Sequence, residues 1–167
     1  MRESVIVAIK TGEPEITWLL HTTNDVAAAV AIDAQDGCEP WSEAMIRDFL
    51  KIGTSHSRII TVDGRVVGFC LYEFGRKRII IHRIAIHRDY RRRGLAKRFL
   101  TLISGTLIAS RRLSVDAVVR ESNLPIQLTL RASGFHGAFL PGHYRRPPEG
   151  GLLFRITNPS FIHEVRA

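Results

Sequence analysis

The chain has 167 residues, of which 45% are hydrophobic and 24% are charged, a composition that is ordinary for a single globular domain. Its longest uninterrupted apolar run, Val26–Ile32, is far shorter than a membrane span, which excludes a protein built on transmembrane helices. Twenty-four Lys and Arg against sixteen Asp and Glu give a formal net charge of +8, which favours polyanionic ligands or partners.

The cysteines and the amino terminus bear on the cellular compartment and the domain limits. Cys38 and Cys70 have no metal-ligand spacing, so we interpret them as free thiols of a cytoplasmic protein and predict no metal site. The amino terminus lacks the small-residue cleavage pattern of a signal peptide. We therefore predict one domain over residues 1–167, in which residues 1–14 form an amino-terminal extension of uncertain structure.

The first third of the chain predicts a strand and two helices. Ile16–Thr22 has the composition of a short strand, and the apolar residues of Val26–Ile32 recur at helical spacing. Pro40–Glu43 begins a second helix, in which Ser42 is the predicted N-cap and apolar residues follow at helical spacing.

Three strands are predicted in the middle of the chain. Arg58–Val62 and Val66–Phe74 are strand-like runs, and the Asp63-Gly64 pair between them is typical of a tight hairpin turn. A third run, Arg78–His87, is rich in β-branched residues and leads into a short polar turn. These three runs are expected to be neighbours in one sheet.

The carboxyl-terminal half predicts, in order, a helix over residues 94–109, a strand over Leu113–Arg120, a helix over Pro125–Ala132, and strands over Phe135–Leu140 and Leu152–Ile156. The complete order is β α α β β β α β α β β. Because a helix connects the third strand of the middle segment to the next strand, these two strands should be parallel. The predicted fold class is α/β, a three-layer domain around a mixed sheet.

Basic residues are concentrated around one strand-to-helix connection. Ten Lys and Arg residues lie in the segment Arg76–Arg98, here called the basic stripe, where Asp89 is the only acid. Within it, Arg91–Lys97 opens a helix and contains the small residues Gly94 and Ala96. A helix amino terminus offers free N–H groups, and small residues let a phosphate approach the backbone. The pyrophosphate of a nucleotide cofactor suits this loop, and a solvated basic turn is the simpler alternative.

Three motifs in the expected order carry a resemblance to the GNAT superfamily of N-acetyltransferases. Ile84–Ala96 resembles its acetyl-CoA motif, a strand followed by Q/R-x-x-G-x-G/A. Ser122-Asn123 and the later Gly134-Phe135 are similar to its "SN…GF" segment. Glu39–Glu43 resembles the "PWSE" start of the second helix in bacterial ribosomal-protein-alanine N-acetyltransferases. The resemblance covers roughly residues 15–157.

The resemblance implies a GNAT-like sheet whose central parallel pair splays around acetyl-CoA. It implies that backbone groups of the strand bind the pantetheine arm, that the loop amides cradle the pyrophosphate, and that an asparagine lies beside the cofactor. The cofactor-binding residues implied in this way are Ile84, Ala85, Ile86, Arg91, Arg92, Arg93, Gly94, Leu95, Ala96, Lys97 and Asn123. Ligands of open α/β sheets bind where parallel strands part at their carboxyl ends, which agrees with this placement.

The proton-transfer residues of the resembled relatives are missing. Those relatives carry a glutamate and a tyrosine where this chain has Val118 and Leu130, and neither replacement exchanges a proton. We expect His82 to act instead, because alternation along its strand places it on one face with Ile84 and Ile86, and with Ile80. Its position also resembles a catalytic histidine of arylalkylamine N-acetyltransferases. The alternative is a packed histidine with a satisfied hydrogen bond.

Five further side chains are candidates for acceptor binding or proton transfer. Tyr144 is predicted as an acid or a substrate clamp, because relatives place a tyrosine in the loop before the last strand. Trp41 and Glu73 are predicted substrate-binding residues, and Trp41 is otherwise a core anchor. Glu73 and Glu121 are also candidates for the base, with a solvated strand-end carboxylate as the alternative for both, and His143 is an additional candidate.

The sequence therefore predicts an acetyl-CoA-dependent N-acetyltransferase that acts on a primary amine, with a protein or peptide N-terminus as the first hypothesis. A second hypothesis is acetylation of a small amine or polyamine. A third is a CoA-binding or ribosome-docking module without catalysis. The basic stripe predicts a ribosomal or RNA-rich partner surface, and the sequence leaves the oligomeric state open.

Overall fold

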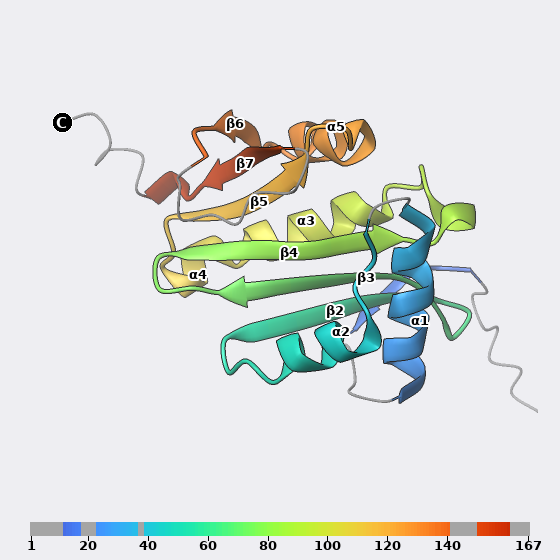
Figure 1. Cartoon of the computed structure of the whole chain (residues 1–167). Coiled ribbons are helices and arrows are strands. Elements are labelled where there is room, and N and C mark those ends of the chain that lie inside the picture. The colour runs from blue at the N-terminus through green and yellow to red at the C-terminus, as the bar shows by residue number, and fades with distance from the viewer. Residues whose placement is uncertain (1–11, 18–22, 37–38, 141–149, 161–167) are drawn as a thin grey trace, which may run out of the picture.

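The computed structural model describes residues 12–17, 23–36, 39–140 and 150–160, and every element of the predicted order occurs in it (Figure 1). A short additional helix and two 3₁₀ turns supplement that order. The elements are β1 (Glu15–Thr17), α1 (Thr23–Asp33), η1 (Ala34–Asp36), α2 (Glu43–Leu50), β2 (Ser55–Val62), β3 (Arg65–Phe74), β4 (Arg78–Ile86), η2 (Arg88–Tyr90), α3 (Leu95–Gly105), α4 (Leu107–Ser110), β5 (Ser114–Arg120), α5 (Leu124–Ala132), β6 (His136–Ala138) and β7 (Gly151–Thr157).

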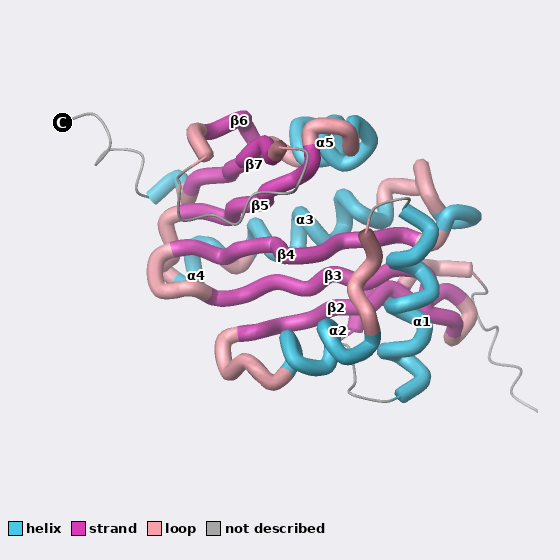
Figure 2. The backbone as a smooth tube through the Cα atoms, in the orientation of Figure 1, coloured by secondary structure: helices cyan, strands magenta, loops and turns pink. Residues whose placement is uncertain are grey.

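The sheet has seven strands in the order β1-β2-β3-β4-β5-β7-β6, and only β4 and β5 are parallel neighbours (Figure 2). Helices α1 and α2 cover one face, and α3, α4 and α5 contribute to the core on the other. The α/β three-layer prediction is therefore confirmed. No helix within the described ranges is long and apolar enough to cross a membrane.

Local sequence signals explain several element boundaries. Asp63 and Gly64 both have positive φ, 50° and 73°, which is the conformation of the tight turn that joins β2 to β3. The Ser42 side chain accepts a hydrogen bond from the Met45 N–H at 3.2 Å and caps α2 as expected. The helix predicted over residues 94–109 is divided at Thr106 into α3 and α4.

The pairing between β4 and β5 stops halfway along both strands. It runs from Arg78↔Ser114 to Ile81↔Ala117, whereas β4 continues to Ile86 and β5 to Arg120. We call the region beyond Ile81 and Ala117 the fork, and Figure 2 shows the two strands diverging there. The carboxyl-terminal half of β4 therefore has backbone groups that pair with β3 on one side and have no β5 partner on the other.

A bulge at His82 changes the direction of the side chains along β4. Leu71 pairs with Arg83 and Tyr72 with Ile81, which leaves His82 as the extra residue. Ile79 and Ile81 pack on the α3 face before the bulge, and Ile84 and Ile86 pack on the same face after it. His82 contacts α2 on the opposite face, so the prediction that it shares a face with Ile84 and Ile86 is wrong. Strict alternation fails because one residue has no cross-strand partner.

Candidate active site

The cofactor-binding candidates lie at the carboxyl end of β4 and in the connection to α3. Ile84, Ala85 and Ile86 form the stretch of β4 beyond the last pair with β5. The chain then passes through η2 and reaches the amino terminus of α3 at Leu95, which is 3% exposed and anchors the helix in the core. The structure therefore brings the strand segment and the basic loop together at the open end of the fork.

The loop before α3 presents its backbone rather than a side-chain cap. Gly94 is the N-cap of α3, with a φ of +75° and no side-chain capping hydrogen bond, and Arg92 also has a positive φ of 62°. Within the part of the chain that the structure describes, the N–H groups of Arg92 to Lys97 have no hydrogen-bond acceptor. A Cβ built on Gly94 would meet no atom within 4 Å. Free donors beside open space at a helix amino terminus suit a phosphate group.

The Arg91 side chain forms hydrogen bonds with other groups of the protein. Its Nε donates to the Ile86 carbonyl at 2.9 Å, and its Nη2 lies 3.3 Å from the Gln35 carbonyl and 2.7 Å from Asp36 Oδ1. The Arg88 N–H also donates to Gln35 Oε1 at 2.9 Å. Burial raises the pKa of Asp36, and the Arg91 charge opposes that shift. These contacts tie η1, which follows α1, to the loop before α3.

The other basic side chains of the loop are of two kinds, those bonded within the protein and those that are exposed without an ion-pair partner in the described part of the chain. The Arg93 Nη2 donates to the Asp89 carbonyl at 3.0 Å, and its guanidinium lies 4.9 Å from the Tyr90 ring centroid. Arg92 and Lys97 are exposed and have no ion-pair partner among the described residues. Arg92 and Lys97 are thus the side chains of this loop that can supply countercharge to an anion.

His82 lies at the closed end of the fork, because it directly follows the last residue of β4 that pairs with β5. Its Nε2 is 3.2 Å from Glu73 Oε2, and its ring centroid is 5.0 Å from that of Phe49 on α2. The side chain is 31% exposed. Burial lowers the pKa of His82, and Glu73 opposes the shift through its hydrogen bond and its charge. The imidazole is therefore neutral at neutral pH and reachable from one side.

A buried ion pair holds the start of α2 against β4. Asp33, which is fully buried, accepts from Arg83 Nε at 2.6 Å and from the Trp41 backbone N–H at 2.7 Å. The Trp41 ring makes an edge contact with Phe49 at 5.7 Å. Sequence reasoning missed the ion pair of Asp33 and Arg83, which are fifty positions apart, and the contact of Phe49 with His82, because no local motif marks either contact.

The positions that hold acid and base in the resembled relatives are apolar in the structure as well. Leu130 is 1% exposed in the core, and Val118 is a partly buried residue of β5 that pairs with Leu153. Asn123 follows β5 and caps α5, with its Oδ1 3.4 Å from the Ile126 N–H. The predicted Tyr144 and the candidate His143 lie outside the described residues.

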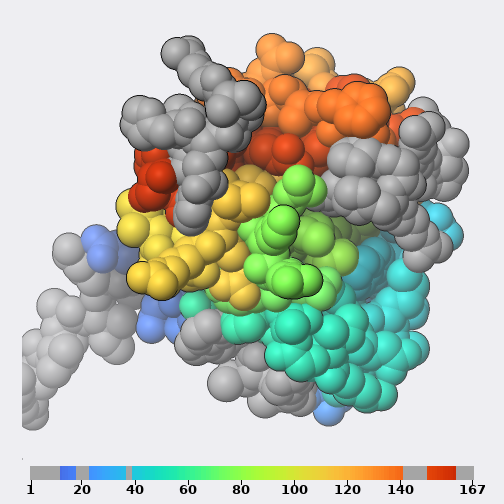
Figure 3. Space-filling view, turned by 90° about the vertical axis from the view of Figure 1, so that its left-hand side faces the viewer, coloured from blue at the N-terminus to red at the C-terminus, as the bar shows by residue number. Residues whose placement is uncertain are grey.

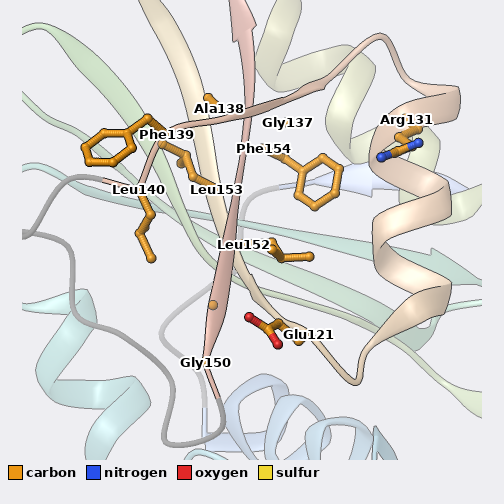
Figure 4. Close-up of a pocket in the computed structure, with 11 residues that line it drawn as sticks. Glu121, Arg131, Gly137, Ala138, Phe139, Leu140, Gly150, Leu152, Leu153 and Phe154 are labelled. Carbon is orange, nitrogen blue, oxygen red and sulfur yellow. The ribbon is translucent and has the colours of Figure 1, made fainter.

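An open pocket of about 620 Å³ lies away from the fork, between α5, β6 and β7 (Figure 4). Glu121 and Arg131 are its charged lining residues, and the Glu121 carboxylate points toward Gly150. None of the cofactor-binding candidates lines it. The described ranges also contain no group of His, Cys, Asp and Glu that could hold a metal ion. The candidate cofactor-binding and proton-transfer groups therefore lie at the fork and not in this pocket.

Comparisons with known proteins agree on one family. The model of the acetyltransferase (GNAT) family matches residues 14–135. The ribosomal-protein-S18-alanine N-acetyltransferase from Escherichia coli has a TM-score of 0.72 and 22% identity, with 87% of this chain and 94% of that chain covered. Ard1 from Thermoplasma volcanium has a TM-score of 0.73 and 21% identity, with 86% of this chain and 97% of that chain covered. A GNAT acetyltransferase from Elizabethkingia anophelis with acetyl-CoA bound has a TM-score of 0.67 and 11% identity over 87% and 98%. No curated protein matches the sequence.

Proposed function

The chain belongs to the GNAT acetyltransferase family, and from this premise we propose that it acetylates the amino terminus of a protein or peptide. It is an acyltransferase, and acetyl-CoA is the acetyl donor of its family. The observation that carries the assignment of the site is the fork, where β4 and β5 stop pairing next to a loop with free backbone N–H groups.

The residues of the fork and the loop fit acetyl-CoA. Beyond Ile81 the edge of β4 has no β5 partner, and its backbone groups that are not already bonded, as the Ile86 carbonyl is by Arg91, can bond an extended arm. The amides of Arg92–Lys97 offer donors to a pyrophosphate. Arg92 and Lys97 add countercharge, and Asn123 stands at the end of β5 across the fork. When bound, acetyl-CoA supplies a thioester carbon that a neutral amine attacks, so that a C–N bond forms as the C–S bond breaks.

His82 is our candidate for the group that makes the amine neutral. An ammonium acceptor must lose one proton before it attacks, and a neutral imidazole can take that proton directly or through a water molecule. The second amine proton is lost after attack and balances the charge on the departing thiolate, so the net reaction releases one proton. The lowered pKa of His82 keeps it in the proton-accepting form at neutral pH.

The acceptor class is supported by likeness of fold and by one sequence segment. A neighbour at a TM-score of 0.72 is named for acetylating the alanine of a ribosomal protein, and Pro40–Glu43 resembles the corresponding helix start. We expect peptides with a free amino terminus to release CoA at a kcat/KM at least tenfold above that of polyamines and small amines. A preference for polyamines would favour the second hypothesis. Tight acetyl-CoA binding without CoA release for any acceptor would favour a non-catalytic module.

The basic stripe is divided by the fold into two separate groups, which a linear reading of the sequence does not reveal. Arg88–Arg98 lies at the carboxyl end of β4, and Arg76 and Lys77 lie at its other end. There the Leu113 N–H donates to the Lys77 carbonyl at 2.8 Å, which places Arg111 beside the same turn. Figure 3 shows the turn between β3 and β4, in green, beside the turn between α4 and β5, in yellow. Arg76, Lys77 and Arg111 are exposed and form the distal basic patch.

We propose that the distal basic patch docks a cytoplasmic, RNA-rich partner. Arg111 ends α4 with a φ of 51°, and its exposed side chain adds a third positive charge to the patch. We expect Lys77→Glu and Arg111→Glu each to weaken binding of an RNA oligonucleotide and to reduce the slope of log Kd against log salt by about one. Fluorescence anisotropy at several salt concentrations measures this slope. Arg65→Glu, at the opposite end of the sheet, is the control, and an equal effect there would contradict the proposal.

A further inference from the structure

Glu73 connects His82 to a third segment of the chain. Its Oε2 is 3.2 Å from His82 Nε2, and its Oε1 accepts a hydrogen bond from Thr54 Oγ1 at 2.9 Å. Thr54 belongs to the turn between α2 and β2, Glu73 to β3, and His82 to the bulge of β4. Both carboxylate oxygens are therefore engaged, Oε2 by the imidazole and Oε1 by the Thr54 hydroxyl.

This arrangement specifies which imidazole nitrogen carries the proton. An ionised carboxylate only accepts hydrogen bonds, so the contact requires a proton on Nε2. A neutral imidazole then has its lone pair on Nδ1. In the described part of the chain, His82 Nδ1 has no hydrogen-bond partner. The free lone pair is thus on the nitrogen that no protein group uses.

We infer that Glu73 is a positioning residue that fixes His82 as the Nε2–H tautomer, so that Nδ1 receives the proton of the acceptor amine. The inference rests on the proposed function. It assigns Glu73 a role different from the substrate contact that the sequence predicts. Thr54 supports this role because its hydroxyl restrains the carboxylate. The proton moves from the acceptor nitrogen to Nδ1, and the Nε2–H bond stays intact.

Burial of His82 and the charge of Glu73 have opposite effects on the pKa of His82. Glu73 on β3 is the charged side chain in contact with the imidazole, and Phe49 on α2 and Thr54 beside β2 add no charge. Burial lowers the pKa of His82, whereas Glu73 raises it. Removing the carboxylate charge must therefore lower the pKa of His82 further.

The test uses the full chain labelled with ¹⁵N in its histidines. Imidazole ¹⁵N shifts distinguish a protonated nitrogen from one that carries a lone pair, and they follow titration without turnover. We expect Nε2–H and a bare Nδ1 in the wild type, a mixture of tautomers in Glu73→Ala, and in Glu73→Gln a lower pKa with the Nε2–H tautomer retained. The acid limb of kcat at saturating acceptor should move to lower pH in Glu73→Gln, with a fall in kcat on the order of tenfold to a hundredfold.

Asp48→Asn is the matched control, because it removes an exposed carboxylate of α2 that pairs with Lys51 and should change neither the spectrum nor kcat. An Nδ1–H tautomer in the wild type overturns the inference, and so does a His82 pKa that is unchanged in Glu73→Gln. If the tautomers behave as expected but no amine is acetylated, the positioning of the imidazole by Glu73 is supported and the proposed function is overturned.

Discussion

Replacing Gly94 with alanine is expected to raise the Kd for acetyl-CoA by about tenfold or more, which corresponds to roughly 1.4 kcal/mol or more. Gly94 has a φ of +75° directly before α3, in the loop whose N–H groups are free. A Cβ there would project into space that no protein atom occupies, which is the space a phosphate needs to approach the backbone. Titration calorimetry with acetyl-CoA and with CoA measures the change.

Gly64→Ala is the matched control for this substitution. Gly64 has a φ of +73°, and a Cβ built on it also meets nothing within 4 Å, but it lies in the hairpin between β2 and β3. Both variants should lose a similar stability, about 1–2 kcal/mol, because alanine is strained in the left-handed region. Only Gly94→Ala should lose cofactor affinity. An equal loss of affinity in both variants would mean that the Gly94 effect is a general consequence of strain.

The order of elements was predictable because its signals are local. Ser42 caps α2 through a residue of its own first turn, and Asp63-Gly64 adopts the positive φ angles of the hairpin turn. The parallel pair followed from a helix crossing between two strands, since such crossovers constrain strand direction. These features depend on backbone preference and on the spacing of apolar residues, which a single sequence displays.

The detailed geometry of the site depends on pairing, which the sequence does not display. The bulge at His82 arises from the register between β3 and β4, and it moves the imidazole to the face of α2. The contact of His82 with Glu73 depends on the same register. Both residues were candidates for the site, but their contact could be found only from the fold.

Arg91 illustrates a second limit of sequence reasoning. Three consecutive arginines next to a glycine suggest one shared task, yet the Arg91 guanidinium binds Ile86, Gln35 and Asp36. Arg83 likewise binds the buried Asp33. These two arginines attach the segment between α1 and α2 to β4 and to the loop before α3. A positive charge is thus a structural connection in Arg91, whereas in its exposed neighbour Arg92 we propose that it is countercharge for the cofactor.

His82→Ala is expected to lower kcat by about a hundredfold or more, the usual scale for removal of a general base. The imidazole lies at the closed end of the fork, and Val118 and Leu130 stand where the resembled ribosomal-protein acetyltransferases carry a glutamate and a tyrosine. Steady-state release of CoA with a saturating peptide measures kcat. The affinity for acetyl-CoA should stay within about twofold, because the cradle residues of the loop do not contact His82.

Two observations separate lost chemistry from lost structure in His82→Ala. Added imidazole should restore part of the rate if a missing proton acceptor is the defect, and an unchanged kcat in a folded variant would remove His82 from the mechanism.

The second observation is the pH dependence of stability. Burial lowers the pKa of His82 below its ordinary value of about 6.5, so between the two values the unfolded chain binds more protons than the folded chain. Wild-type stability should therefore decrease as the pH falls through that window, and the alanine variant should lose this part of the pH dependence. A kcat defect together with a flattened stability profile would assign both effects to the same partly buried imidazole.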